Sequence, residues 1–307
     1  MRYGDAILDL VTRYLRSGCV IVGNGLTNPY KFGGYFMRLA EKLPDAIVDT
    51  PISEAGYSGM AVGMALAGVR TILYFERMNF MRYAYDALFN ELLKAGMIAS
   101  ERCSDLGILI WTQVNRGKGL GAQHVDCFYS EFMQHPGIEL WSPWHPREFE
   151  IVLDWMYKYG GIRMIIDDRD LYGNEYDGSE PFGAAVIAKS GDEITLVSFS
   201  AAFDICMRAV GEDDGVEVIR LSRLKPLDID LIAESVKKTG KLLVVEPSWV
   251  TCGIGSEIAA GLLERGIGCR MRRLGLPECS APAGELESAY WLSEDKVIRE
   301  VEVLRDE

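Results

Sequence analysis

The chain has 307 residues, of which 49% are hydrophobic and 25% are charged, an ordinary globular composition for one or two domains. Its formal net charge is −13 and it has no block of lysine and arginine, which argues against nucleic acid as a partner, because phosphate binding needs a basic surface. No apolar run approaches the roughly 18 residues of a membrane span, so we expect no membrane insertion. The N-terminus lacks the charge-then-apolar order of a signal peptide, so we expect a cytoplasmic protein.

The first half of the chain predicts a parallel sheet. Residues 1–18 have the pattern of an amphipathic helix. Short apolar runs then alternate with helical stretches, and alternation of this kind is typical of a parallel sheet with helices on both faces. The expected strands are 19–22, 46–49, 69–75, 106–112, 138–141 and 163–167.

A stretch rich in turn-forming residues, DRDLYGNEYDGSEPFG, precedes a second alternation. In this second half we expect strands at 194–200, 216–221, 241–247 and 269–274, helices near 203–211, 228–239 and 254–265, and a helical tail over 284–304. The fold class is therefore α/β, with two three-layer α/β/α domains. The boundaries predicted from the pattern are 1–175 for the first domain, 176–192 for the linker and 193–307 for the second domain.

The cysteines indicate reduced thiols. They lie at 19, 103, 127, 206, 252, 269 and 279, and no two of them form a CxxC pair. An odd number of scattered cysteines argues against a disulfide framework and against a zinc site, so we expect no metal ligands of this kind.

The segment from Asp49 to Gly68 is unusually rich in small residues. Thr50 is suited to cap a helix and Pro51 to occupy its first position, which would put Glu54 in the first turn. Each glycine costs a helix about 1 kcal/mol relative to alanine, so the close approach of another backbone is the natural compensation. The alternative is a tightly packed core helix in which Glu54 only complements the positive helix end.

Two further segments offer chemistry. A glycine-rich loop over 115–123 leads into His124, and histidine is the side chain best suited to proton transfer near neutral pH. The alternative is a loop with an incidental histidine. Phe80 follows an apolar strand, where parallel sheets bind ligands, and could pack on a flat ring, although an aromatic residue at such a place is more often part of the core.

Five segments, in order and over nearly the whole chain, resemble the beta subunit of the heterotetrameric 2-oxoacid dehydrogenases of the pyruvate and branched-chain type. They are DTPISEAGYSGMAVGMALAGVR, ALFNELLKA preceded by Asp86, GAQHVDCFYSEFMQHPGIELWSP, PFGAAVIAKSGDEITLVSFS and VVEPSWVTCGIGSEIAA. The resemblance implies a pyrimidine-binding domain for thiamine diphosphate, followed by a domain like the C-terminal domain of transketolase.

The resemblance also implies site residues. Glu54 would hydrogen-bond the aminopyrimidine ring of thiamine diphosphate and share the proton that a ring nitrogen must take. Phe80 and Tyr57 would contact the cofactor, and His124 would face the substrate and assist proton transfer. The chain would then be catalytic: a decarboxylating 2-oxoacid dehydrogenase subunit that passes an acyl group to a lipoyl carrier.

The family holds the cofactor's diphosphate and Mg²⁺ by a GDG…N motif on a second subunit, and no such motif occurs in this chain. The resemblance therefore implies a shared site in an α2β2 heterotetramer with a diphosphate-binding alpha subunit, active only as the complex, and a lipoyl acyltransferase as a further partner.

Departures from the family pattern leave two alternatives. Gly23-Asn-Gly-Leu26 replaces the usual Gly-Glu-Asp-Val, and Thr112–Gly117 departs from the usual strand-to-loop signature. A subunit of a split transketolase or of an acyloin-forming carboligase would share Glu54 but pass its acyl carbanion to an aldehyde. A regulatory or structural paralogue is the other alternative, and the presence of Glu54, Phe80 and His124 together argues against it.

Overall fold

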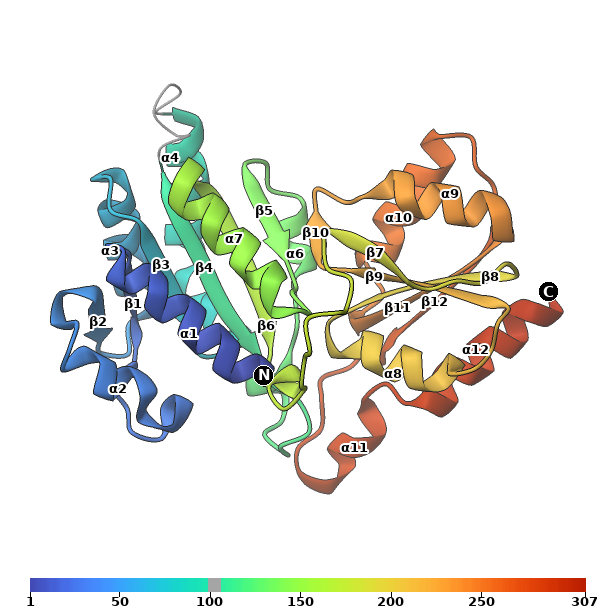
Figure 1. Ribbon diagram of the computed structural model, residues 1–307, viewed down its shortest axis with the longest axis horizontal. Helices are drawn as coiled ribbons and strands as arrows, with labels where there is room; N and C mark the ends of the chain where they lie inside the picture. Colours follow the sequence, from blue (N-terminus) through green and yellow to red (C-terminus); the bar gives the residue numbers. More distant parts are fainter. Residues whose placement is uncertain (99–105) are drawn as a thin grey trace. The chain divides into compact units, whose positions relative to one another are not determined.

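The computed structural model describes residues 1–98 and 106–307, without the side chains of 96–98 (Figure 1). The chain divides into two compact units. The first unit comprises Met1–Asn115, Gln134–Trp141 and His145–Asp177, and the second comprises Arg116–Met133, Ser142–Trp144 and Gly178–Glu307. No single cut in the sequence produces this grouping, because two segments from the first half of the chain lie in the second unit.

The first unit is built on a parallel sheet whose strands lie side by side in the order β5-β6-β4-β3-β1-β2. These strands are β1 (Val20–Asn24), β2 (Ile47–Thr50), β3 (Thr71–Phe75), β4 (Gly107–Val114), β5 (Ile138–Trp141) and β6 (Gly161–Asp168). Strands β3 and β4 are buried along their whole length, as expected for a sheet covered on both faces. The predicted strands and their parallel pairing are confirmed.

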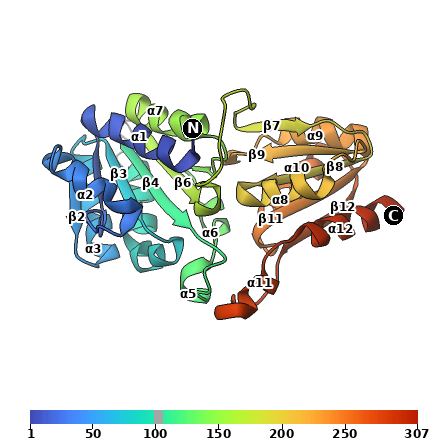
Figure 2. The ribbon, with the colours of Figure 1, turned by 60° about the horizontal axis from the view of Figure 1, so that its bottom comes forward.

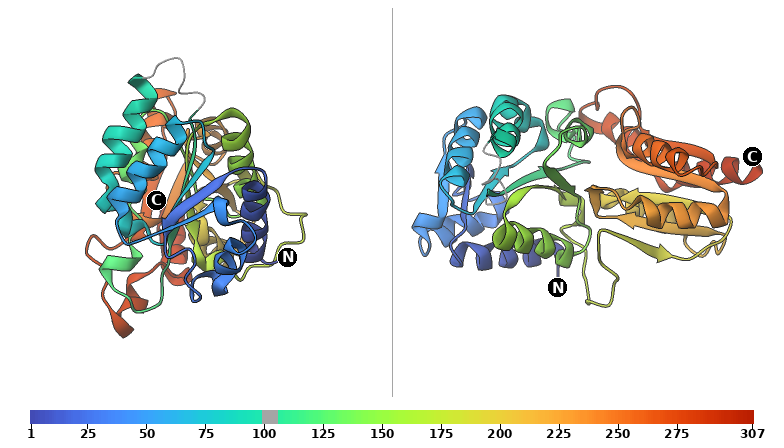
Figure 3. Two further views of the ribbon diagram at one scale, coloured as in Figure 1. Left: turned by 90° about the vertical axis from the view of Figure 1, so that its left-hand side faces the viewer. Right: turned by 90° about the horizontal axis from the view of Figure 1, so that it is seen from above.

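Helices cover both faces of this sheet. Helices α1 (Tyr3–Arg16) and α7 (Pro146–Tyr159) pack together on one face, as Figure 3 shows. The other face carries α3 (Glu54–Leu66), the 3-10 helix η3 (Met78–Ala84), the π-helix η4 (Asp86–Leu92) and α4 (Leu93–Ile98). The short helices η1 (Lys31–Gly34), α2 (Tyr35–Ala40) and η2 (Pro44–Ala46) follow β1, and η6 (Arg169–Leu171) follows β6.

The second unit has the same three layers around a mixed sheet in the order β12-β11-β8-β9-β7. Its strands are β7 (Ala185–Lys189), β8 (Ile194–Phe199), β9 (Val216–Leu221), β11 (Lys241–Trp249) and β12 (Arg270–Leu276), and a short strand, β10 (Arg223–Lys225), follows β9. Helices α8 (Ser200–Val210) and α12 (Glu294–Asp306) cover one face, and α9 (Ile229–Thr239) and α10 (Ile254–Glu264) cover the other (Figure 1).

Short helices complete the second unit: α5 (Ala122–Val125), α6 (Ser130–Met133), η7 (Gly284–Leu286) and α11 (Glu287–Tyr290). The two-domain α/β architecture predicted from the sequence is confirmed.

Three local expectations are wrong. Strand β7 lies inside the stretch expected to be a linker, because its five residues are stabilised by distant antiparallel pairing with β9. The C-terminal tail is not one helix: α11 ends at Tyr290, and α12 starts anew after Ser293, whose hydroxyl accepts a hydrogen bond from the Lys296 amide. Thr50 is not a helix cap, because it pairs with Asn24 in the parallel ladder, and α3 begins at Glu54 after Ser53.

Candidate cofactor and catalytic site

Glu54 is the first residue of α3, the helix that follows β2. Its side chain is half-buried, at the helix end where the backbone dipole favours negative charge. Next to Glu54, one face of α3 is bare, meaning that no other described part of this chain covers it and it is exposed to solvent. Ile52 is 80% exposed and Met60 is 39% exposed, and Gly56 and Gly63 lie on the same surface. Glu54 therefore stands at the edge of an exposed apolar face made largely of small residues.

Tyr57 lies beneath Glu54 in the core of the first unit. It is 4% exposed, and its ring centroid lies 5.5 Å from that of Phe75. Burial raises the pKa of the Tyr57 hydroxyl, and the charge of Glu54 adds to the rise. One turn after Glu54, the buried Ser58 hydroxyl has no hydrogen-bond partner among the described residues. Polar groups thus collect at the start of this glycine-rich helix.

Phe80 lies on η3, which begins three residues after β3 ends and packs against α3. Its backbone amide donates to the Arg77 carbonyl at 3.1 Å, and its side chain is half-buried. Glu54, Tyr57 and Phe80 therefore come from adjoining elements on one face of the first sheet.

His124 belongs to the second unit. It lies on α5, and its backbone amide donates to the Gly121 carbonyl at 3.1 Å. The three glycines that precede it, Gly117, Gly119 and Gly121, all have φ near +70°, a conformation that other residues adopt only with strain. The glycine-rich loop predicted from the sequence is thus explained by its backbone geometry, although its place in the second unit was not expected.

Sequence reasoning missed Glu246, a fully buried carboxyl in the second half of β11. Burial raises the pKa of Glu246 to about 7, against the lowering effect of hydrogen bonds from the Tyr129 hydroxyl at 2.5 Å and the Gly255 amide at 3.3 Å. Its sequence signal is a glutamate that ends an apolar strand and precedes Gly253 and Gly255. Those glycines are required because a Cβ at Gly253 would lie 2.0 Å from Glu246 Oε2.

A second buried carboxyl, Asp167, is the last residue but one of β6 in the first unit. Its Oδ2 accepts hydrogen bonds from Trp111 Nε1 at 2.9 Å, from Gln113 Nε2 at 3.1 Å and from the Tyr172 hydroxyl. Burial raises the pKa of Asp167, and these donors oppose the rise. The cluster ties β4 to β6 at their carboxyl ends.

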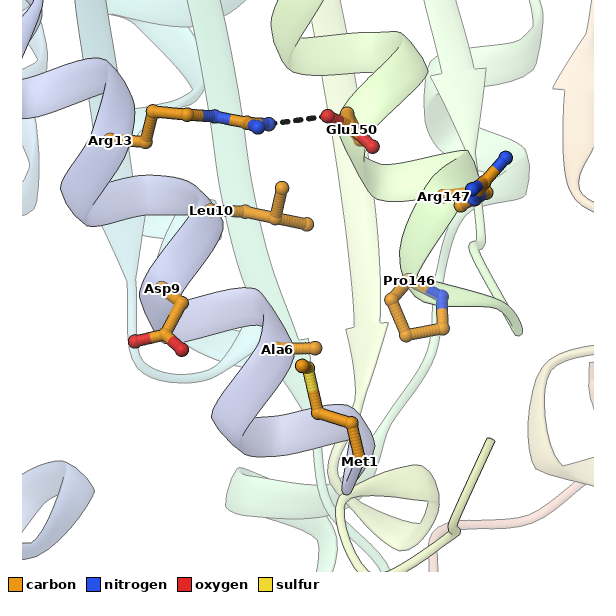
Figure 4. A pocket seen from close by; sticks show the side chains of 8 residues that line it. All are labelled: Met1, Ala6, Asp9, Leu10, Arg13, Pro146, Arg147 and Glu150. Carbon is orange, nitrogen blue, oxygen red and sulfur yellow. Dashed lines mark hydrogen bonds and ion pairs between the residues drawn. The ribbon is translucent and has the colours of Figure 1, made fainter. Parts of the chain in front are cut away.

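The groove between α1 and α7, about 450 Å³ in volume, lies apart from these residues (Figure 4). It is lined by Leu10, Pro146 and the ion pair of Arg13 with Glu150, among others, and by none of the predicted site residues.

Over the described ranges, no group of three or more histidine, cysteine, aspartate or glutamate side chains is placed to hold a metal. Nor does any helix there have the length and apolar character needed to cross a membrane. Cys103 lies outside the described residues, and none of the other six cysteines forms a disulfide bond.

Two three-layer α/β units with these sheet orders define a protein of the transketolase type. The family described as the transketolase pyrimidine-binding domain matches residues 15–174, and that described as the transketolase C-terminal domain matches residues 183–297. A solved chain described as "Split gene transketolase, inactive beta4 tetramer" has the same fold, with a TM-score of 0.79 over 99% of this chain and 96% of that chain at 20% identity.

Sequence relatives narrow the class. The pyruvate dehydrogenase E1 component subunit beta of Rickettsia bellii is 35% identical over 71% of this chain and 69% of its own length. The mitochondrial beta subunits of Dictyostelium discoideum and Homo sapiens are each 32% identical, over 72% and 71% of this chain and 65% and 64% of their own lengths. The matches thus span about two thirds of these relatives. The chain belongs to the transketolase-like family of pyruvate dehydrogenase E1 beta subunits, a family of components of thiamine-diphosphate-dependent enzymes.

Proposed function

We propose that this chain is the beta subunit of a thiamine-diphosphate-dependent enzyme that decarboxylates a 2-oxoacid and transfers the acyl group to a lipoyl carrier. The observation that carries the proposal is the place of Glu54. A half-buried carboxyl begins a helix at the edge of a bare face of small residues, with Phe80 on the adjoining η3.

These residues fit the pyrimidine end of the cofactor. The ring needs a carboxyl that shares a proton with one of its nitrogens, and an aromatic or apolar surface for its face. Glu54 offers the first and Phe80 the second, while the buried Tyr57 ring fixes the helix turn that carries Glu54. When bound, thiamine diphosphate supplies the nucleophilic carbon and stabilises the negative charge left when carbon dioxide departs.

The protein residues then move protons and orient the reactants. Glu54 holds a proton at the pyrimidine nitrogen and takes it back, a role that an amide side chain cannot perform. Phe80 fixes the plane of the ring. His124 donates or accepts a proton at the oxygen of the substrate's keto group, and its glycine-rich approach lets the backbone come close to that group.

The proposed partner is a diphosphate-binding alpha subunit in an α2β2 assembly. This chain lacks a GDG…N motif, so the diphosphate and Mg²⁺ would be held mainly by the partner. The bare face of α3, with Gly56 and Gly63, would receive that subunit, because glycines let another backbone approach closely. A lipoyl acyltransferase as second partner and a cytoplasmic location remain predictions.

A carboligase that hands the acyl group to an aldehyde is the second candidate. The family's acidic residue after the first strand is Asn24 here, and its amide donates to the Thr50 carbonyl at 3.0 Å. Beside it, Lys31 pairs with Glu76 at 2.8 Å. The charges at the carboxyl ends of these strands thus differ from the family pattern, which favours a different acceptor for the acyl group. Assays with lipoyl and aldehyde acceptors would separate the two candidates.

The test is Glu54→Gln in the complex co-purified with its native partner, assayed for decarboxylation of several 2-oxoacids with an artificial electron acceptor. We expect turnover to fall by about 100-fold or more, because general acid–base groups contribute about that much, while thermal unfolding stays unchanged. Glu294→Gln is the matched control, since Glu294 also begins a helix, α12, and should keep wild-type activity. Near-wild-type turnover of Glu54→Gln would remove Glu54 from the mechanism.

A further inference from the structure

The loop that carries His124 is clamped by a segment from the end of the chain. The Gly117 amide donates to Glu287 Oε1 at 2.9 Å, and the Gly284 amide donates to the Gly119 carbonyl at 3.1 Å. Next to the second of these bonds, Leu120 forms an antiparallel bridge with Ala283. Figure 2 shows α5 beside α11, which begins at Glu287. The backbone before His124 is therefore held from one side over several residues.

Glu287 has an unusual environment for a residue that only caps a short helix. It is 2% exposed, and its Oε1 accepts a second hydrogen bond, from Trp291 Nε1 at 3.2 Å. Its Oε2 is buried and has no hydrogen-bond partner among the described residues. Burying a carboxylate is costly unless its hydrogen bonds compensate, so burial alone does not favour a charged side chain here. What the carboxylate adds is a stronger, charge-assisted bond to the Gly117 amide.

The chain after His124 is fixed as well. Val125 lies in the core of the second unit, and the Cys127 carbonyl accepts a hydrogen bond from the Ser248 hydroxyl at 2.6 Å. The conformation of the glycine loop before His124 is less constrained by its own sequence, because three glycines with positive φ make this backbone flexible. Glu287 holds this loop through its hydrogen bond with the Gly117 amide.

We propose that Glu287 is a positioning residue, which sets the location of the His124 imidazole by holding the glycine loop at Gly117. The proposal rests on the proposed role of His124 in proton transfer. It assigns no contact with substrate or cofactor to Glu287 itself.

The first test needs no activity. The full chain is labelled at its three histidines, and the imidazole signals are followed by NMR in wild type, Glu287→Ala and Glu287→Gln. We expect Glu287→Ala to shift and broaden the His124 signal and to speed hydrogen exchange of the loop amides. His135 and His145 belong to the first unit and serve as internal controls. The amide oxygen of Glu287→Gln can still accept from Gly117, so this variant should restore most of the wild-type signal.

A matched control separates positioning from loss of a buried carboxylate. Glu217 is 2% exposed, lies in the same unit as His124 and forms an ion pair with Lys238. Glu217→Ala should leave the His124 signal unchanged even if it lowers stability. If Glu287→Ala fails to fold, Gly121→Ala perturbs the same clamp, because its Cβ would lie 3.2 Å from that of Ala283 at φ +73°. An unmoved His124 signal in the folded variant overturns the proposal.

The second test uses the complex. In Glu287→Ala we expect kcat to fall by up to about 100-fold with KM for the 2-oxoacid nearly unchanged, since a misplaced catalytic group costs about that much. The double variant with His124→Ala should be no slower than His124→Ala alone, because Glu287 acts through His124. Independent, additive losses would overturn the proposal. If His124→Ala keeps full activity while the NMR signal still moves in Glu287→Ala, the proposed role of His124 fails and the clamp stands.

Discussion

At the scale of single residues, the chain keeps several carboxyl groups in strands and at helix ends, where they are desolvated or hydrogen-bonded by neighbouring groups. Glu246 is the strongest case, with its two oxygens held by the Tyr129 hydroxyl and the Gly255 amide. Because burial raises the pKa of Glu246 from 4.5 to about 7, the folded protein binds a proton that the unfolded chain has already released over that interval. Stability must therefore fall as the pH rises between these values.

We expect Glu246→Gln to flatten this pH dependence. The native carboxyl contributes a slope of at most about 1.4 kcal/mol per pH unit between its unfolded and folded pKa values, and the amide contributes none. Urea unfolding at a series of pH values measures the slope directly. Glu257→Gln is the control, since Glu257 is exposed on the adjacent helix α10. Equal slopes in wild type and Glu246→Gln would show that this carboxyl ionises alike in both states.

At the scale of elements, α3 and α10 use glycine for different reasons. At the start of α10, Gly253, which precedes the helix, and Gly255 make room for Glu246, because a Cβ at either position would meet its carboxylate. In α3, a Cβ at Gly63 would meet nothing within 4 Å, so the small residue is not required by this chain's own packing. Glycine lowers the stability of a helix, so a glycine that packing within the chain does not require indicates packing against another molecule. The proposed partner subunit would be that molecule.

We expect Gly253→Ala to destabilise the protein by about 1–3 kcal/mol, the usual cost of overpacking, because its Cβ would lie 2.0 Å from Glu246 Oε2. Chemical unfolding of the full chain measures the loss. Gly268→Ala is the matched control, since a Cβ there meets nothing and its φ is not positive. A Gly253→Ala variant as stable as wild type would mean that the carboxyl moves aside at little cost.

At the scale of the whole molecule, the described ranges of the chain offer a carboxyl, aromatic rings and a histidine, but no cluster able to hold a metal. Under the proposed function, a cofactor that carries a diphosphate and Mg²⁺ would gain only part of its contacts from this chain. The contacts made by another subunit are lost when that subunit is absent. The affinity for thiamine diphosphate and Mg²⁺ should therefore depend on assembly of the complex.

We expect the isolated chain to bind thiamine diphosphate and Mg²⁺ with an affinity weaker than micromolar, and the co-purified complex to bind them at least about 100-fold more tightly, a gain of about 2.7 kcal/mol. Titration calorimetry on both samples measures the difference. The Glu54→Gln complex is the control for pyrimidine contacts. Micromolar binding by the chain alone would contradict a shared site.

The sequence by itself determined most of the strands, the parallel sheet of the first half and the two-domain α/β class, because these follow from local apolar patterns and from the alternation of strands with helices. It also singled out Glu54 and His124, because a helix-start glutamate amid glycines and a histidine after a glycine loop are local signals. Strand β7 and the unexpected start of α3 depended on distant pairing, which no local pattern reveals. The break in the tail lies at a local helix cap, Ser293.

Only the tertiary structure decided which unit carries His124. The segment Arg116–Met133 precedes β5 in the chain, yet its contacts lie with residues near 246 and 284 in the second unit. The tertiary structure also revealed Glu246 and Glu287 as buried carboxyls, because burial depends on packing between segments far apart in sequence. The physical reason is the same in both cases: hydrogen bonds and desolvation are set by neighbours in space, whereas the sequence lists only neighbours along the chain.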